Sequence, residues 1–549
     1  MHDVDVIEGI ISEIPFIIQT NDFECDNNVI TGCVQVKFDD LTKPIHIVVS
    51  IFPQYPLKNH ESESIKFTCS ELINYKHVME DGSICIHTSH HTVLKQKLLI
   101  DFYSLKLWFD KYYFNNARDE HYEHVITSES LINEKYNSYV FTDVDYKFAK
   151  GNFGSVKLSR LQTGTYKDKP IDNFIVQGFS LNNISLNCNW GKFYSQLHNS
   201  NEGLFFFLGD HPAKFDRFIY KEWSDFNDLL PTEFLKLINA SEFNDAGLLP
   251  IFLGYDTVDN EIHWQVALIE KGKLPLEEKY VQKGIVALPE WELINDKVNW
   301  ALSRNSSYKY FYGRGALCPQ ITESKILILG VGAIGSIIAK SLTRGGAREI
   351  SIADYDVKEY ENICRSEYMF QFGLGDKANE LEQILSLTSP FADIEVINGE
   401  YFESIIKMFR DDPEARENFI STLNKYEIVF DCTTDNDLMF ILNNLELECD
   451  VINLSITNHA NELVCAFHPN IYRFVLTQFE DVLDNLTEDL YEPTGCWNPT
   501  FKASYTDIDM LVQIATKHIN NIYKMGSKKK NFIIKVDKNE ACSIELREF

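Results

Sequence analysis

The sequence predicts an α/β protein of several domains, in which the C-terminal part is a doubly wound, mostly parallel sheet. The chain has 549 residues, more than one hydrophobic core normally holds. From Ser324 onward, strand-like and helix-like segments alternate, as they do when helical crossovers join parallel strands. The first strand and the first helix of this alternation are joined by GVGAIG, Gly330 to Gly335, a glycine-rich turn.

Residues 1–142 are expected to form a small α+β domain. VITGCVQVKF and PIHIVVSIF show the alternating or continuous β-branched patterns of strands. After a loop-like stretch around Cys85, KQKLLIDFYSLKLWFDKYYF returns to helical spacing. Its apolar stripe consists of Leu98, Phe102, Leu105 and Phe109.

Residues 143–310 are expected to form a mixed α/β middle domain. NFIVQGFSL, GLFFFLG and EIHWQVALIE are strand-like, and a helix is predicted near PTEFLKLINA. These residues suggest no chemistry, which favours a scaffold or spacer.

Residues 311–549 hold the alternating pattern. KILILG, EISIAD, IEVING, YEIVFDCT and VINLSI are predicted strands, and GAIGSIIAKSLTRGG, KANELEQILSL and DLMFILNNLELE are predicted helices. Near the end, TDIDMLVQIATKHINNIYK predicts a helix with a single apolar face, and that face is interpreted as packing. It consists of Ile508, Leu511, Val512, Ala515, Ile519 and Ile522.

Composition excludes several classes of function. A formal net charge of -30 argues against a nucleic-acid or anionic-membrane surface, because phosphates would be repelled. The N-terminal sequence resembles no signal peptide, and no apolar stretch is long enough to span a membrane. The twelve cysteines form no C-x-x-C pair, so neither zinc nor a disulfide framework is expected. A cytoplasmic protein is therefore expected.

The glycine turn predicts a nucleotide site. Gly330, Gly332 and Gly335 permit a tight turn and let backbone N–H groups approach phosphates at a helix N-terminus. In such sites an acid ends the second strand and binds ribose hydroxyls, and Asp354 has that position. The glycines alone would also fit a helix that simply packs on a strand.

The segment after Asp354 favours ATP over a dinucleotide. Asn362, Arg365 and Lys377 follow it in one loop-to-helix stretch, where fixed cations would meet the charge that grows on departing pyrophosphate. FDCTTDN then ends a strand at the carboxyl edge of the sheet, and its Asp435 is a candidate ligand for Mg²⁺ between phosphate oxygens. Each residue alone would also fit a surface or capping role.

Residues from about Tyr312 to Ile522 resemble the ThiF-type adenylation domain, whose fold is Rossmann-like. FYGRGAL, the segment from ILILG to NICR, GDK and DCTTDN carry the resemblance. It implies that Asp354 and the glycine turn hold ATP, that Arg365 and Lys377 neutralise phosphates, and that Asp435 engages Mg²⁺. It also implies a homodimer in which Arg314 reaches the partner's site. The reaction of the family joins a C-terminal glycine carboxylate to AMP and releases pyrophosphate.

An acyl-adenylate needs an acceptor, and a thiolate is a suitable one. Cys496, in YEPTGCWNPTF, resembles the acceptor cysteine of bacterial activating-enzyme homologues. The acidic segment EDVLDNLTEDLYE before it opposes ionisation of the thiol, so a packed, inactive Cys496 is the alternative. Cys432 is interpreted as a buried strand residue.

Residues from about 10 to 125 resemble a ubiquitin-conjugating domain, with Cys85 of DGSICIH as its acceptor cysteine. The family carries His-Pro-Asn shortly before that cysteine, whereas this chain has Tyr75, Lys76 and His77. His77 could support an oxyanion or lower the pKa of the thiol, and an ordinary loop histidine is an equal alternative.

The domain order resembles the fused conjugating and activating enzymes of bacterial CBASS anti-phage operons. That resemblance implies an ATP-dependent relay from Cys496 to Cys85 and then to a lysine of an acceptor protein. The protein transferred would be a cGAS-like nucleotidyltransferase or a ubiquitin-like protein ending in glycine. Three alternatives remain: activation of a sulfur-carrier protein without conjugation, a non-catalytic nucleotide sensor, and a dehydrogenase.

Overall fold

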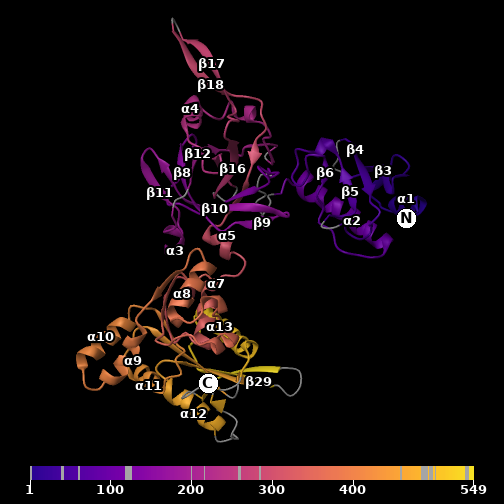
Figure 1. Ribbon diagram of the computed structural model, residues 1–549. Coiled ribbons are helices and arrows are strands. Elements are labelled where there is room, and N and C mark those ends of the chain that lie inside the picture. The colour runs from indigo at the N-terminus through magenta and orange to yellow at the C-terminus, as the bar shows by residue number, and fades with distance from the viewer. Residues whose placement is uncertain are drawn as a thin grey trace.

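The computed structural model consists of three units that follow one another along the chain (Figure 1). The structure describes residues 3–38, 43–59, 62–117, 127–198, 201–215, 217–257, 261–283, 286–457, 460–483, 492–493, 499–500, 503–537 and 543–549. Within these ranges, none of the helices has the length and apolar composition needed to cross a bilayer.

The N-terminal unit is an antiparallel sheet with helices packed on one apolar core. Its strands are β1 (Ile17–Gln19), β2 (Glu24–Asp26), β3 (Val29–Val36), β4 (Ile45–Ile51), β5 (Ile65–Thr68) and β6 (Ser83–Ile84), in the order β1-β3-β4-β5-β6 with β2 on β3. Its helices are α1 (Val4–Ser12), η1 (Ser70–Leu72), α2 (Leu94–Trp108) and η2 (Phe109–Phe114). All four residues of the predicted stripe are fully buried, three of them on α2 and Phe109 at the start of η2, which confirms the helical pattern.

The middle unit is built on a ten-stranded sheet. Along its main path the order is β19 (Asn299–Trp300), β16 (Ile262–Glu270), β15 (Leu248–Asp256), β12 (Asn201–Gly209), β8 (Phe153–Arg160), β10 (Lys169–Leu181), β7 (Tyr136–Phe141) and β20 (Leu302–Asn305). The strands β9 (Gly164–Tyr166) and β11 (Ile184–Asn187) pair with β10. Since β7 belongs to this sheet, the middle unit begins before the expected boundary at residue 142.

Apolar clusters cover both faces of this sheet. Phe205 and Phe207 of β12 belong to one cluster and Phe206 to the other, which explains the continuous apolar run GLFFFLG. The surrounding elements include α3 (Lys192–Ser195), η3 (Trp223–Phe226), the predicted helix α4 (Thr232–Ala240) and the short hairpin β13 (Ala213–Lys214) with β14 (Phe218–Ile219). A second hairpin, β17 (Leu276–Lys283) with β18 (Val286–Leu293), projects from the unit (Figure 1).

The C-terminal unit is the predicted doubly wound sheet. Its order is β23 (Asp393–Val396), β22 (Glu349–Ala353), β21 (Lys325–Leu329), β24 (Ile428–Asp431), β25 (Asp450–Thr457), β26 (Glu462–Phe467), β29 (Phe532–Asp537) and β30 (Ser543–Glu548). The first five strands are parallel and the last three antiparallel. A further short pair joins β27 (Glu492–Pro493) to β28 (Pro499–Thr500).

Helices cover both faces of this sheet. Ile326 and Ile328 pack with α7 (Ala333–Arg344), α8 (Lys377–Thr388) and α13 (Tyr505–Met525). Leu327 and Leu329 pack with α9 (Gly399–Met408), α10 (Pro413–Leu423), α11 (Asn436–Asn444) and α12 (Tyr472–Leu483). The remaining short helices are α5 (Tyr308–Tyr312), α6 (Pro319–Thr322), η4 (Tyr360–Arg365) and η5 (Phe370–Phe372).

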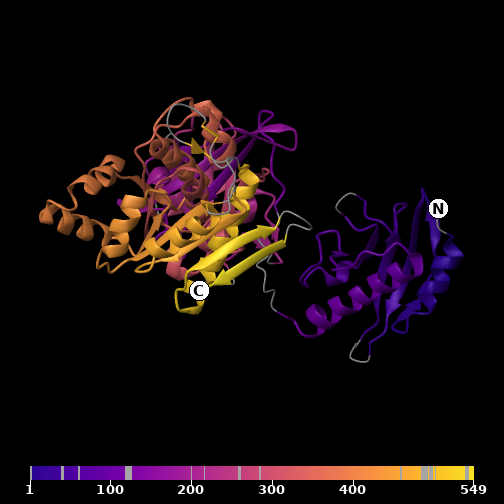
Figure 2. The same cartoon turned by 90° about the horizontal axis from the view of Figure 1, so that it is seen from below.

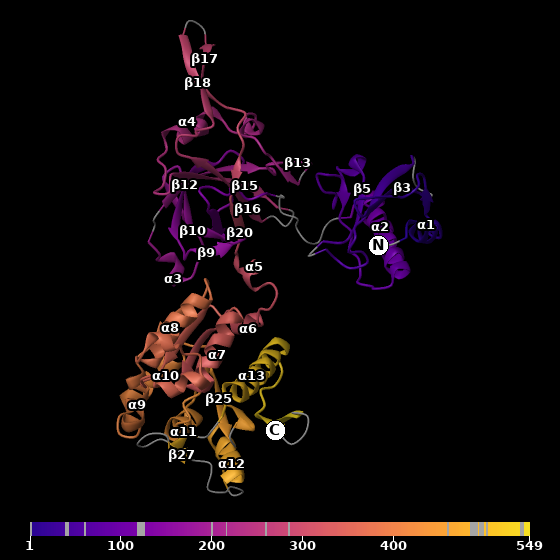
Figure 3. The same ribbon diagram turned by 45° about the vertical axis from the view of Figure 1, so that its right-hand side comes forward.

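The two junctions between units differ in kind. Phe391 of the C-terminal unit is buried in the core of the middle unit, where its ring stacks on Trp190 at 5.6 Å. The N-terminal unit lies to one side of the other two (Figures 2 and 3). There Arg217 donates to the carbonyl of Ile73 at 2.7 Å, and Lys221 pairs with Glu80 at 2.6 Å.

Candidate active site

The glycine turn joins β21 to α7 and needs two of its glycines for the fold. Gly330 has φ +75°, and a Cβ there would lie 2.8 Å from Cα of Thr433. A Cβ on Gly335 would lie 2.0 Å from the carbonyl oxygen of Gly330. Gly332, in contrast, faces open space, which leaves the N-terminus of α7 accessible to an anion.

A cavity of about 310 Å³ lies beside this turn, at the carboxyl ends of the parallel strands. Such an edge is where ligands bind in doubly wound folds. Six of the residues singled out from the sequence line the cavity together: Gly330, Gly332, Asp354, Asn362, Arg365 and Lys377. The other lining residues are Ala333, Ile334, Asp356, Ser366, Tyr368, Cys432, Thr433, Thr434, Ile456 and Ile508.

Asp354 follows β22 and is held by backbone donors. Its Oδ2 accepts from the N–H of Val331 at 2.7 Å, and its Oδ1 accepts from the N–H of Asp356 at 2.8 Å. Burial raises the pKa of this carboxyl, while the two N–H groups and the charge of Lys377 act in the opposite direction. The carboxyl is therefore fixed in place beside the glycine turn, where it could accept from ribose hydroxyls.

The two cations enter the cavity from successive elements. Arg365 ends η4, and Lys377 is the first residue of α8. Nζ of Lys377 lies 2.8 Å from Oδ2 of Asp356, so this lysine already has an anionic partner. Asn362 uses its Oδ1 to accept from the N–H of Glu359 at 3.0 Å, which stabilises the start of η4. Sequence reasoning missed Asp356, although the pattern DYD contained it.

Asp435 is the N-cap of α11. Its Oδ1 accepts from the N–H groups of Asp437 and Leu438 at 2.8 and 3.0 Å. It lies beyond the residues that line the cavity, beside the fully buried Asp431, whose pKa is raised by burial. No group of three or more His, Cys, Asp or Glu side chains in the described ranges could hold a metal alone. A carboxylate at this edge fits Mg²⁺, which usually binds one or two carboxylates together with phosphate oxygens.

Arg314 and two cysteines complete the candidates of the C-terminal unit. Arg314 is exposed just after α5 and does not line the cavity. Cys432 does line it, but burial raises the pKa of its thiol well above the ordinary value, which disfavours the reactive thiolate. Cys496 lies outside the described residues.

Cys85 follows β6 on the N-terminal unit and is exposed. Its N–H donates to the carbonyl of His77 at 2.7 Å. His77 has φ +59°, a left-handed conformation that a non-glycine residue adopts only when its surroundings hold it there. The ring of His77 lies 4.5 Å from the ring of Tyr112 and 6.0 Å from that of His87. The backbone of His77 thus fixes Cys85, and its ring packs among aromatic side chains.

A buried polar network, which sequence reasoning missed, holds the chain just after Cys85. Nζ of Lys97 donates to Asp101 at 2.6 Å, to Thr88 at 3.0 Å and to Glu63 at 3.2 Å. The hydroxyl of Tyr55 donates to Asp101 at 2.8 Å, and Thr88 donates to the same carboxylate. The side chains of Lys97 and Asp101 are only 3% and 0% exposed. The network ties the segment of Cys85 to α2.

Comparison with known proteins identifies the fold of the C-terminal unit. Residues 303–451 match the model of the ThiF family. The chain is 26% identical over 239 residues to the ATP-dependent ubiquitin transferase-like protein Cap2 of Enterobacter hormaechei, which covers 42% of this chain and 38% of that protein. It is 24% identical over 177 residues to the adenylyltransferase and sulfurtransferase MOCS3 of Danio rerio, covering 30% of this chain and 35% of that protein.

Among solved structures, E. coli MccB with AMPCPP and MccA matches 42% of this chain and 64% of its own, at 14% identity and a TM-score of 0.29. The chain spans about a third of the length of the two relatives compared above.

Proposed function

Because residues 303–451 form a ThiF family domain, we propose that this chain is an ATP-dependent protein ligase. In this proposal it adenylates the C-terminal carboxylate of a client protein, passes the acyl group to Cys496 and then to Cys85, and delivers it to an amine. The single observation that supports adenylation most strongly is the cavity that gathers the glycine turn, Asp354, Arg365 and Lys377. An acid for ribose and two cations for phosphates are the groups that ATP requires.

In the first step a carboxylate oxygen of the client's terminal glycine attacks the α-phosphorus of ATP. The bond from that phosphorus to its bridging oxygen breaks, and pyrophosphate leaves. Backbone N–H groups of α7, Arg365 and Lys377 stabilise the negative charge, and Lys377 exchanges Asp356 for phosphate oxygens. Asp435 would hold Mg²⁺, which would neutralise part of the phosphate charge.

The later steps use sulfur as acceptor. The thiolate of Cys496 attacks the acyl carbon and AMP leaves, after which the thiolate of Cys85 takes the acyl group by exchange. A lysine amine of the acceptor protein then attacks the thioester, which forms an isopeptide bond and returns a free thiol. The exposure of Cys85 and the rigid hold of His77 on its backbone support an accessible, fixed acceptor. His77 would orient Cys85 in this step.

The similarity to Cap2, an ATP-dependent ubiquitin transferase-like protein, supports a client of the ubiquitin-like class. A cGAS-like nucleotidyltransferase as client and a cytoplasmic setting are parts of the proposal that rest on the resemblance of the domain order to CBASS enzymes. We also propose a homodimer. The segment 355–374 beside the cavity exposes large apolar side chains, including Tyr355 at 60%, Phe370 at 76% and Leu374 at 59%. In the proposed homodimer a second copy covers this segment and supplies its Arg314 to the cavity, as the family resemblance implies.

One alternative has its own support. The similarity to MOCS3, an adenylyltransferase and sulfurtransferase, favours activation of a sulfur-carrier protein without conjugation. In that case the N-terminal unit would serve only as a docking module, and pyrophosphate exchange would not depend on Cys85.

The test measures adenylation and then locates the acyl group on the chain. The full chain is incubated with ATP, magnesium and candidate proteins that end in glycine, and ATP–pyrophosphate exchange is measured. Mass spectrometry under non-reducing conditions then locates the adduct, and Cys85→Ser should trap it as an ester. Cys25→Ala is the matched control, since Cys25 is an exposed cysteine of the same unit. Full isopeptide product from Cys85→Ala would overturn the relay, while exchange without any thioester would favour the sulfur-carrier alternative.

A further inference from the structure

Glu367 is a buried carboxylate within the segment that carries the phosphate-binding candidates. It lies two residues after Arg365, and its neighbours Ser366 and Tyr368 both line the cavity. The side chain of Glu367 is only 7% exposed. A buried charge needs partners, and Glu367 has them on two different helices.

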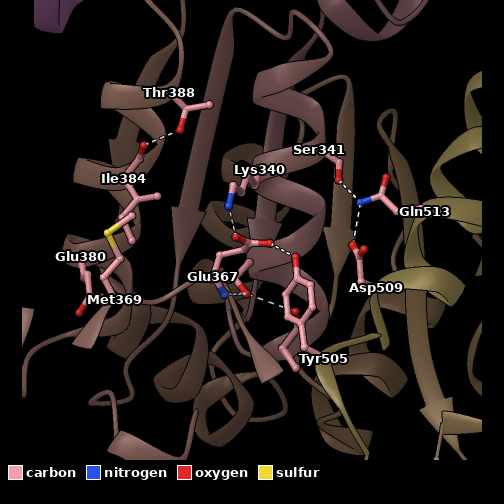
Figure 4. A network of polar contacts seen from close by, with 12 residues as sticks. Lys340, Ser341, Glu367, Met369, Glu380, Ile384, Thr388, Tyr505, Asp509 and Gln513 are labelled. Carbon is pink, nitrogen blue, oxygen red and sulfur yellow. Dashed lines mark hydrogen bonds and ion pairs between the residues drawn. The ribbon is translucent and has the colours of Figure 1, made fainter. Parts of the chain in front are cut away.

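The carboxylate of Glu367 joins α7 to α13 (Figure 4). The hydroxyl of Tyr505, the first residue of α13, donates to its Oε1 at 2.5 Å. Its Oε2 pairs with Nζ of Lys340 on α7. The N–H of Glu367 also donates to the hydroxyl of Ser336 on α7 at 3.3 Å. One side chain thus connects the N-terminus of α13, the helix that begins at the glycine turn, and residues 360–368, which are called the Arg365 segment below.

The first turn of α13 is itself part of the cavity wall. Ile508, three residues after Tyr505, lines the cavity and is 2% exposed. Ser504 caps this turn by accepting from the N–H of Asp507 at 3.2 Å. A nucleotide that fills the cavity therefore touches both the Arg365 segment and the start of α13, and Glu367 is the polar link between them.

The negative charge of Glu367 strengthens its contacts with both helices. Burial and the hydrogen bond to Glu367 both raise the pKa of Tyr505, so its hydroxyl remains a donor. A charge-assisted bond to a carboxylate is stronger than one to an amide, and the Lys340 pair exists only with the carboxylate. Further along the helices, Gln513 donates to the hydroxyl of Ser341 at 2.7 Å on the exposed side.

We propose that Glu367 is a positioning residue that holds the first turn of α13 against the Arg365 segment, so that nucleotide binding in the cavity orders the start of α13. The effect of this ordering on acyl transfer rests on the proposed function, whereas the ordering itself does not. In the sequence, Cys496 precedes Tyr505 by nine residues, so the start of α13 is close along the chain to the thiol proposed to receive the acyl group.

The direct test needs MgATP but no client protein. Hydrogen–deuterium exchange of peptides covering 503–512 is measured in the full chain with and without MgATP. ATP should protect this turn in the wild type, and both Glu367→Gln and Tyr505→Phe should abolish that protection while changing the Kd for ATP less than about threefold. Tyr505→Phe keeps the ring and removes only the hydroxyl. Gln513→Ala, on the same pair of helices, is the matched control and should behave as wild type.

The second measurement separates this inference from the proposed function. With a client that supports pyrophosphate exchange, Glu367→Gln should exchange at the wild-type rate. It should form the Cys496 thioester about tenfold more slowly, because a distant mutation that misplaces reacting groups by about 1 Å can cost up to about a hundredfold in rate. Wild-type protection of 503–512 in both variants would overturn the inference, as would an equal loss of exchange and thioester. Failure of the wild-type chain to activate any client would overturn the proposed function but leave the ATP-only test decisive.

Discussion

The ammonium of Lys377 and the carboxylate of Asp356 lie 2.8 Å apart at the mouth of the cavity, on the first turn of α8 and in the loop after β22. The side chain of Lys377 is 11% exposed and that of Asp356 is 57% exposed. Lys377 is therefore held close to the solvent-exposed carboxylate of Asp356. A phosphate that binds in the cavity must compete with this carboxylate for the ammonium group.

Removal of Asp356 should strengthen ATP binding. Asp356→Asn leaves Lys377 without its ion-pair partner and removes a negative charge from the cavity, so the Kd for ATP should fall about threefold to tenfold. Lys377→Met should raise the Kd by at least a similar factor. Titration calorimetry with MgATP checks both, and weaker binding by Asp356→Asn would show that Asp356 itself contacts the nucleotide or its metal.

The pH dependence of ATP binding should reflect Asp354. Burial raises its pKa in the folded chain, so its contribution to stability is present below the unfolded pKa and lost as the pH rises through the folded one. Asp354→Asn should therefore not lower the free energy of unfolding near neutral pH. The carboxylate is a stronger acceptor for ribose hydroxyls than the protonated acid. Because the pKa is raised, ATP affinity should begin to fall at a higher pH than it would with an ordinary aspartate. ATP titrations across pH test this, and an equally steep profile in Asp354→Asn would contradict it.

Alanine substitutions at two glycines of the turn should have different effects, one on stability and the other on ATP binding. Gly335→Ala places a Cβ 2.0 Å from the carbonyl of Gly330, which forces the backbone apart and should lower the free energy of unfolding by about 3 kcal/mol or more. Gly332→Ala meets open space, so it should fold normally and bind ATP more weakly. Denaturant unfolding and ATP titration measure the two effects. Normal ATP binding by Gly332→Ala would mean that phosphates do not approach the N-terminus of α7.

The buried pair in the N-terminal unit should dominate the stability of that unit. Lys97→Met leaves Asp101 without its cation and should cost about 3–5 kcal/mol. Lys95→Met is the matched control, because Lys95 pairs with Glu13 on the surface and such pairs contribute at most about 1 kcal/mol. The double variant Lys97→Met/Asp101→Leu should recover part of the loss. Alkylation of Cys85 should be faster in Lys97→Met, because removal of the lysine frees the segment that follows Cys85 from its contact at Thr88.

Much of the fold follows from local sequence patterns. The five parallel strands of the C-terminal unit and the helices α7, α8, α11 and α13 were predictable because the hydrophobic alternation and the glycines agree there, and the glycine turn indicated the position of the cavity. The antiparallel strands β26, β29 and β30 and the helices α9, α10 and α12 were not predicted. The stripe on α2 was predictable because its period matches a helix. In the middle unit, apolar runs such as that of β12 identify strands, but strands buried on both faces carry no alternation that would reveal their neighbours.

The candidate site was predictable only in part. Asp354, Arg365 and Lys377 follow one another in a recognisable order, whereas Asp356 gains its meaning only when Lys377 folds back on it. Ile508 matched a packing stripe and does pack, yet it also lines the cavity. The partners of Glu367 lie far away in sequence, so no local pattern identifies this residue. Lys97 and Asp101 do have the (i,i+4) spacing of a helical ion pair, but that spacing also fits a surface pair, and only the packing of α2 shows that this pair is buried.

The stacking of Phe391 on Trp190 in the core of the middle unit has a thermodynamic consequence. Because a side chain of the C-terminal unit completes the core of the middle unit, neither can lose its structure without exposing apolar surface of the other. The two should melt as one cooperative block, whereas the N-terminal unit, attached by polar contacts, should melt separately. Scanning calorimetry should accordingly resolve two endotherms, and Phe391→Ala should split the larger one.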